Sequence, residues 1–69
     1  MSKTNETKVH FSFEYRDGTE WNFEGIFEGT ENEILAQILM ITRGTLMASS
    51  GNKGTAYNPE GFEICSYQK

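Results

Sequence analysis

The sequence predicts a small α+β domain in which one helix packs on one face of an antiparallel sheet of three or four strands, in the order ββαββ. Three observations predict it: apolar and polar residues alternate in residues 9–27, a single stretch with helical periodicity follows at residues 30–49, and two shorter extended segments come after a turn-rich run. The helix stripe and the aromatic strand face are the largest apolar surfaces of the chain. We therefore expect them to cover each other.

The first hairpin is indicated by a period of two. In residues 9–16 the odd positions are apolar or aromatic and the even positions are polar. Residues 20–27 repeat the pattern, with Trp21 among the aromatic residues of one face. Ile26 breaks the alternation on the polar face, which predicts a bulge near Gly25.

The turn of this hairpin follows from its register. A two-residue turn would set Phe13 opposite Asn22 and mix apolar with polar residues on each face. A three-residue loop at residues 16–18 instead pairs Phe13 with Trp21 and places Gly18 in the left-handed conformation that such a loop needs. We expect the second register.

The helix is predicted to begin at a capping box formed by Thr30 and Glu33. Gly44 leaves two alternatives for its end: the helix stops at Arg43, or it continues through Gly44 to a point near Ser49. The apolar stripe keeps its phase beyond Gly44, so we predict the longer helix. The stripe consists of Ile34, Leu35, Ile38, Leu39, Ile41 and Leu46, with Thr42, Thr45 and Ala48 on the same half of the helix.

The opposite side of the helix carries Ala36, Met40, Arg43 and Met47. Methionine is adaptable and is over-represented at binding surfaces. These residues are a candidate contact ridge for a partner or for a second copy of the chain. The alternative is that the methionines are scattered surface residues without a role.

The segment after the helix predicts a second, shorter hairpin. Residues 49–54 have the composition of a turn, and residues 58–61 (Asn-Pro-Glu-Gly) form the turn between extended segments at 55–57 and 62–67. If residues 55–57 are only a loop, the pattern becomes ββαβ. We expect Phe62 and Ile64 to face the core and Cys65 and Tyr67 to point outward.

The length of 69 residues allows one domain, which we place at residues 9–69 after a mobile tail at residues 1–8. Cys65 is the only cysteine, so no internal disulfide forms, and a reducing compartment is favoured. No apolar stretch is long enough to span a membrane, and residues 1–8 lack the apolar centre of a signal peptide. A cytoplasmic protein is expected.

The net charge of −4 arises from ten acidic and six basic residues that are unevenly placed. Such a charge disfavours nucleic acid and anionic membranes as partners, and it favours a protein with a basic surface. Glu14, Glu20 and Glu24 lie on the polar side of the first hairpin and are the candidate contact residues. The alternative is that these charges only keep a small protein soluble.

Chemistry is not indicated anywhere in the chain, and we predict no catalytic residue, metal ligand or cofactor. His10 is the only histidine, and it lies on the polar strand face. A Cys65–His10 nucleophile and base pair would lack a third, orienting group. Residues 49–54 lack the spacing of a phosphate-binding loop.

These features predict a small acidic protein-binding module without enzymatic activity, acting as an accessory or inhibitor protein. A very short acidic domain with a polar tail and no catalytic residues is similar to many small phage or mobile-element proteins that act on host machinery, an analogy that rests on no specific motif. Two alternatives remain: a nucleic-acid-associated regulator that uses its sheet face, and a homodimeric structural protein that associates through the helix.

Overall fold

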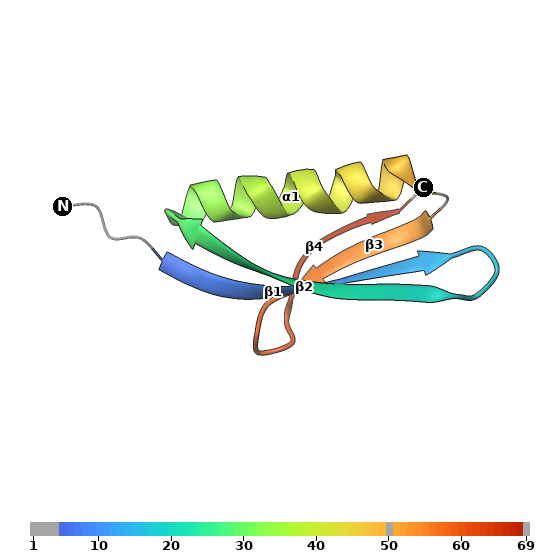
Figure 1. The fold of residues 1–69 in the computed structure, drawn as a ribbon, viewed down its shortest axis with the longest axis horizontal. Helices are drawn as coiled ribbons and strands as arrows, with labels where there is room; N and C mark the ends of the chain where they lie inside the picture. Colours follow the sequence, from blue (N-terminus) through green and yellow to red (C-terminus); the bar gives the residue numbers. More distant parts are fainter. Residues whose placement is uncertain (1–4, 50, 69) are drawn as a thin grey trace.

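The computed structural model describes residues 5–49 and 51–68 of the chain. Its elements are β1 (Asn5–Tyr15), β2 (Glu20–Gly29), α1 (Glu31–Ala48), β3 (Gly51–Tyr57) and β4 (Glu63–Gln68). The strands form one antiparallel sheet in the order β2-β1-β3-β4, and α1 lies along one face of it (Figure 1). The predicted α+β fold with the order ββαββ is confirmed, with four strands.

The first hairpin has the predicted register, with Phe13 opposite Trp21. The Tyr15 amide donates to the Thr19 carbonyl at 3.0 Å, and Gly18 adopts a φ of 86° in the three-residue loop. The Thr19 hydroxyl and amide both donate to the Asp17 carboxylate, at 2.6 and 3.0 Å, and these bonds lower the pKa of Asp17. The loop is therefore fixed by its own side chains.

The bulge expected near Gly25 is wrong. The register between β1 and β2 runs without a shift from Glu14 to Asn5, and Gly25 simply stands opposite Val9. Ile26 keeps its place on the polar side of the strand and is 67% exposed. An exposed apolar residue on the polar side of a strand therefore does not require a bulge.

The first strand begins at Asn5, so residues 5–8 of the expected tail belong to the sheet. Asn5 pairs with Gly29 at the far end of β2, directly before the helix cap. Because β2 continues to that point, the polar residues before Val9 have a strand to pair with. Residues 1–4, the rest of the expected tail, lie outside the described residues.

The helix has the predicted boundaries. The Glu33 amide donates to the Thr30 hydroxyl at 3.2 Å, and the Thr30 amide donates to Glu33 Oε1 at 3.1 Å. This capping box lowers the pKa of Glu33, mainly through the bond from the Thr30 amide. At the other end Ser49 is the C-cap, and its amide donates to the Thr45 carbonyl at 3.0 Å. The helix thus passes through Gly44 and ends at Ala48.

The core lies between α1 and the middle of the sheet. Its helix side is one row of residues spaced by four, and beneath the row Val9, Phe11 and Phe13 are fully buried. Leu35 differs from the prediction, because it is 44% exposed beside the row. The expected packing of the helix stripe on the aromatic face of the first hairpin is confirmed, because Val9, Phe11, Phe13 and Phe27 form one buried cluster with the helix row. The backbone of α1 comes closest to the glycine-containing strand β3. The buried row consists of Ile34, Ile38, Thr42 and Leu46.

The expected turn at residues 49–54 is wrong from Gly51 onward, because β3 begins there. A Cβ atom on Gly54 would lie 2.7 Å from Phe13 Cε1, and one on Gly51 would lie 3.0 Å from Leu46 Cδ1. The glycines are strand residues that allow close packing between helix and sheet.

The turn between β3 and β4 forms as predicted, but the faces of β4 do not. The Asn58 side chain accepts hydrogen bonds from the amides of Glu60 and Phe62, at 3.0 and 2.8 Å, and Gly61 has a φ of 92°. Phe62 is 68% exposed in this turn instead of facing the core.

A bulge explains why Cys65 and Tyr67 face the core together with Ile64. Tyr57 pairs with Glu63 while Ala56 pairs with Cys65, so Ile64 is the extra residue. Ile64 therefore packs against the core as expected, and Cys65 and Tyr67 do so as well instead of pointing outward. The Cys65 thiol donates to the Thr42 hydroxyl at 3.7 Å, and that hydroxyl donates to the Ile38 carbonyl at 2.7 Å.

Candidate protein-binding surfaces

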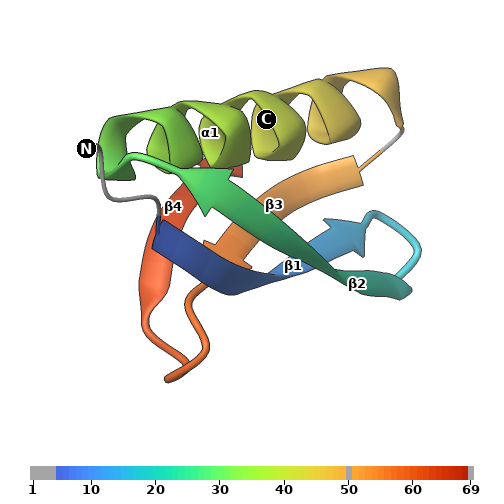
Figure 2. The same cartoon turned by 60° about the vertical axis from the view of Figure 1, so that its left-hand side comes forward.

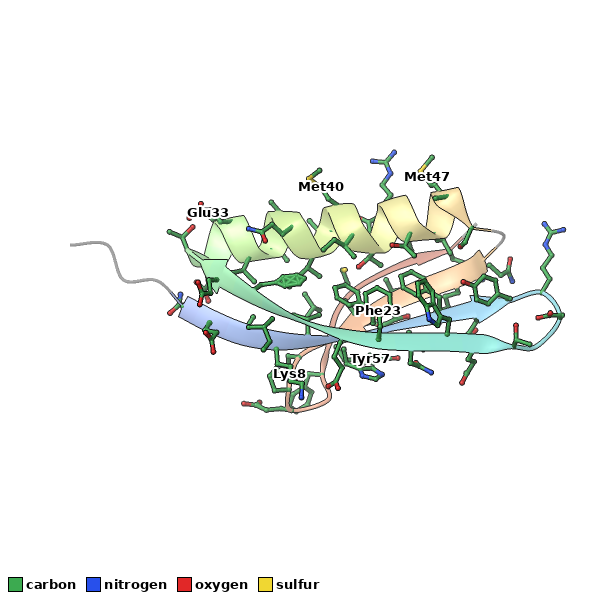
Figure 3. The ribbon with its side chains drawn as sticks, viewed as in Figure 1. Lys8, Phe23, Glu33, Met40, Met47 and Tyr57 are labelled. Carbon is green, nitrogen blue, oxygen red and sulfur yellow. The ribbon has the colours of Figure 1, made fainter. Side chains whose placement is uncertain are left out.

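The two predicted contact surfaces lie on opposite sides of the molecule. Figure 3 shows Met40 and Met47 on the side of α1 that points away from the sheet, and Lys8 and Tyr57 on the opposite side of the molecule. We call the side of the sheet that faces away from α1 the outer sheet face. A single flat partner surface therefore contacts only one of the two.

The structure brings Glu14, Glu20 and Glu24 together on the outer sheet face. Glu14 of β1 stands directly opposite Glu20 of β2. This pair falls at a position without backbone hydrogen bonds, because the neighbouring Tyr15 is bonded to Thr19, and side chains at such positions approach most closely. Like charges in direct opposition destabilise a sheet.

A second pair of the same kind occurs at the other end of the hairpin, where Glu6 stands opposite Glu28. Among the described residues, the ion pair found is Lys8 Nζ to Glu24 Oε2 at 3.4 Å, with both side chains more than half exposed. Exposed pairs of this kind contribute little to stability. Lys53 of β3 also stands opposite Glu14 on this face, so the surplus of negative charge lies mainly along β2.

A hollow of about 470 Å³ opens on the outer sheet face between the first hairpin and the turn that joins β3 to β4. The rings of His10 and Tyr57 lie 6.4 Å apart there. Cys65 packs on the helix side of the sheet, so the sheet separates it from His10. The hollow is lined by Lys8, His10, Glu24, Tyr57, Asn58, Pro59 and Gly61.

The part of the chain that the structure describes contains no group of three His, Cys, Asp or Glu side chains that is arranged to hold a metal ion. The hollow itself presents a single carboxylate and a single imidazole. The residues that line the hollow do not combine a nucleophile, a base and an orienting group.

The contact ridge on α1 is continuous. Ala36, Met40, Arg43 and Met47 are separated by four, three and four residues, which keeps them on one line of the helix surface. All of them are exposed, Met40 by 74% and Met47 by 66%. A Cβ atom on the neighbouring Gly44 would meet nothing within 4 Å.

Two features were missed from the sequence. The first is the edge strand β2, whose Trp21 is 49% exposed on the helix side of the sheet. The sequence offered one sign that β2 lies at the edge of the sheet, namely the apolar Ile26 on its polar side. The second is a groove of about 350 Å³ beside Leu35, lined by Thr7, Glu31, Asn32, Ile34, Leu35, Ile38 and Ile64.

Comparison of the chain with protein-family models, with curated proteins and with solved structures finds no match in any of the three. The structure shows a small α+β domain with one helix on a four-stranded sheet, with several glutamates on the outer sheet face and two exposed methionines on α1. No helix in residues 5–49 or 51–68 has the length and apolar character needed to cross a membrane.

Proposed function

We propose that this protein is a non-enzymatic binding module that docks on a basic surface of another protein through its outer sheet face. Glu14, Glu20 and Glu24 are the contact residues. The observation that carries the proposal is the direct opposition of Glu14 and Glu20 across β1 and β2. A domain that binds without chemistry changes what its partner does, as an accessory or an inhibitor.

Lys53 offsets part of the repulsion between Glu14 and Glu20 in the free domain, and a lysine or arginine of a partner beside Glu20 relieves the rest on binding. The net charge of −4 adds long-range steering toward a positive surface. Association is therefore expected to be fast at low ionic strength and to slow as salt is added.

Two other functions are less well supported. Nucleic acid would bring phosphates against the glutamates of the outer sheet face, which opposes binding. Self-association through the contact ridge is compatible with the proposal, because the ridge lies on the opposite side of the molecule.

Affinity capture with two matched variants tests the proposed function. Glu14→Gln with Glu20→Gln removes two charges from the outer sheet face, and Glu31→Gln with Glu33→Gln removes two charges from the first turn of α1, where glutamine can still complete the capping box. We expect proteins with basic surfaces to be retained by the wild type and the control, to be lost from the sheet-face variant, and to be released by added salt. Equal capture by all three forms would contradict the proposal.

A further inference from the structure

The edge strand β2 is long and open. It spans 10 residues, and β1 is its only partner strand among the described residues. In Figure 2, β2 runs along the near margin of the sheet. Because the Tyr15 amide bonds to Thr19, the odd-numbered residues of β2 direct their backbone groups toward β1. The even-numbered residues, such as Asn22 and Glu24, therefore direct their N–H and C=O groups to the open edge.

The two sides of this edge differ in chemistry. On the helix side Trp21 is half exposed and Phe23 is half buried, with their rings 4.9 Å apart. On the outer sheet face the row reads Glu20, Asn22, Glu24, Ile26 and Glu28. A strand laid against β2 would thus meet an aromatic surface on one side and a mainly acidic row on the other.

We propose that the edge of β2 receives an extended segment of the partner as a fifth strand of the sheet, and that this segment alternates basic and apolar residues. Its basic side chains lie beside Glu20, Glu24 and Glu28, and its apolar side chains cover Trp21 and Phe23. Backbone hydrogen bonds provide affinity and the alternation provides specificity. The inference rests on the proposed function and states how the partner is held.

Charge decides between this occupant and a second copy of the chain. Two β2 strands paired antiparallel would bring glutamates directly or diagonally opposite one another in each register that keeps the outer sheet faces together. A basic segment turns the same row into a set of attractive contacts. Edge strands with rows of charge are a known means of preventing self-pairing.

Synthetic peptides provide the test. The probe is a peptide of 10 residues, the length of β2, that alternates lysine and valine. Its control has the same composition with the lysines and valines in separate blocks. We expect the alternating peptide to bind about tenfold more tightly by calorimetry, and the amides of Asn22, Glu24 and Ile26 to exchange with solvent about tenfold more slowly in the complex. The amides of Trp21 and Phe23, already directed to β1, serve as internal controls.

A proline separates strand addition from simple charge attraction. Asn22→Pro removes one N–H from the open edge and leaves both the ladder to β1 and the glutamates in place. We expect this variant to lose the preference for the alternating peptide, and Asn22→Ala to keep it. Equal binding of both peptides, or unchanged exchange at Asn22 and Glu24 of the wild type, would overturn the inference.

These experiments distinguish a failure of strand addition at β2 from a failure of the acidic contact. Binding that is equal for both peptides but weakened by Glu14→Gln with Glu20→Gln would leave the acidic contact standing without a fifth strand. Binding that is insensitive to this pair of substitutions would contradict the acidic contact itself. Protection of Asn22 and Glu24 that rises with protein concentration in the absence of peptide would make the occupant a second copy and would overturn the inference.

Discussion

At the scale of single residues, glycine favours the folded state at one position of this chain and disfavours it at another. Gly54 lies where β3 passes under α1, and a Cβ atom there would be 2.7 and 2.9 Å from two atoms of the Phe13 ring. Phe13 is fully buried, so its ring has no space into which it can turn. Gly44 lies inside α1 with open space around it. It contributes only backbone freedom to the unfolded chain.

We therefore predict that alanine has opposite effects at these two positions. Gly54→Ala should lower the free energy of unfolding by about 1–3 kcal/mol, because it overpacks the core. Gly44→Ala should raise it by about 0.5–1 kcal/mol, because it removes a poor helix former. Urea unfolding of both variants measures the two effects. A neutral Gly54→Ala would mean that β3 and Phe13 are not in close contact.

At the scale of elements, the helix start is an electrostatic device as well as a hydrogen-bonded one. The Glu33 carboxylate accepts from the Thr30 amide and lies in the first helical turn, where negative charge is favourable. The hydrogen bonding with Thr30, the backbone amide first, favours the charged form and holds the pKa of Glu33 below its ordinary value. The unfolded chain, which lacks the cap, keeps the ordinary value.

This difference predicts the direction of a pH effect. The contribution of the Glu33 carboxylate to stability is fully present above the ordinary glutamate pKa, and it is lost as the pH falls through the lowered pKa of the folded state. Wild type should therefore lose more stability on acidification than Glu33→Gln. Unfolding curves at a series of pH values check this, and parallel losses in the two proteins would contradict it.

The cap also allows the two hydrogen bonds of Thr30 to be separated. Thr30→Ala removes the hydroxyl and should cost about 0.5–2 kcal/mol of stability. It leaves the Thr30 amide, which is the main cause of the lowered pKa of Glu33. We expect the pKa of Glu33, measured by NMR titration, to rise only part of the way to its ordinary value. A full return would assign the effect to the hydroxyl.

Elements whose signals are local were the ones that the sequence predicted well. The capping box spans residues 30–33, and the register of the first hairpin follows from aromatic alternation on both sides of Gly18. The start of β3 was not predictable in the same way. A glycine signals a turn when only its neighbours are considered, whereas Gly54 is needed because Phe13 and α1, distant in sequence, approach it. The bulge at Ile64 likewise turns Cys65 and Tyr67 to the core without a local signal in the sequence.

At the scale of the whole molecule, the sheet separates two surfaces of different chemistry. The acidic row of the outer sheet face was predictable because charge and alternation are properties of neighbouring residues. The exposure of Trp21 was not, because it depends on strand order: β3 pairs with β1, which leaves β2 at the margin. The close approach of the backbones of α1 and β3 also depends on that order, because β3 occupies the middle of the sheet beside β1.

The contact ridge predicts self-association that depends on two residues. We expect wild type to form dimers at high concentration in sedimentation experiments, and Met40→Asp with Met47→Asp to remain monomeric with an unchanged circular dichroism spectrum. Both side chains are mostly exposed, so their replacement leaves the core intact. The control, Asn32→Asp with Gln37→Asp, adds the same charge at other exposed helix positions. A wild type that stays monomeric would remove the self-association hypothesis.

The position of Trp21 has a practical consequence. It is the only tryptophan of the chain, and its indole lies half in solvent at the margin of the sheet. The wavelength of its fluorescence emission therefore reports on one defined place in the molecule without any label. A ligand that covers β2 should shift this emission to the blue, whereas one bound to the far side of α1 should leave the spectrum unchanged.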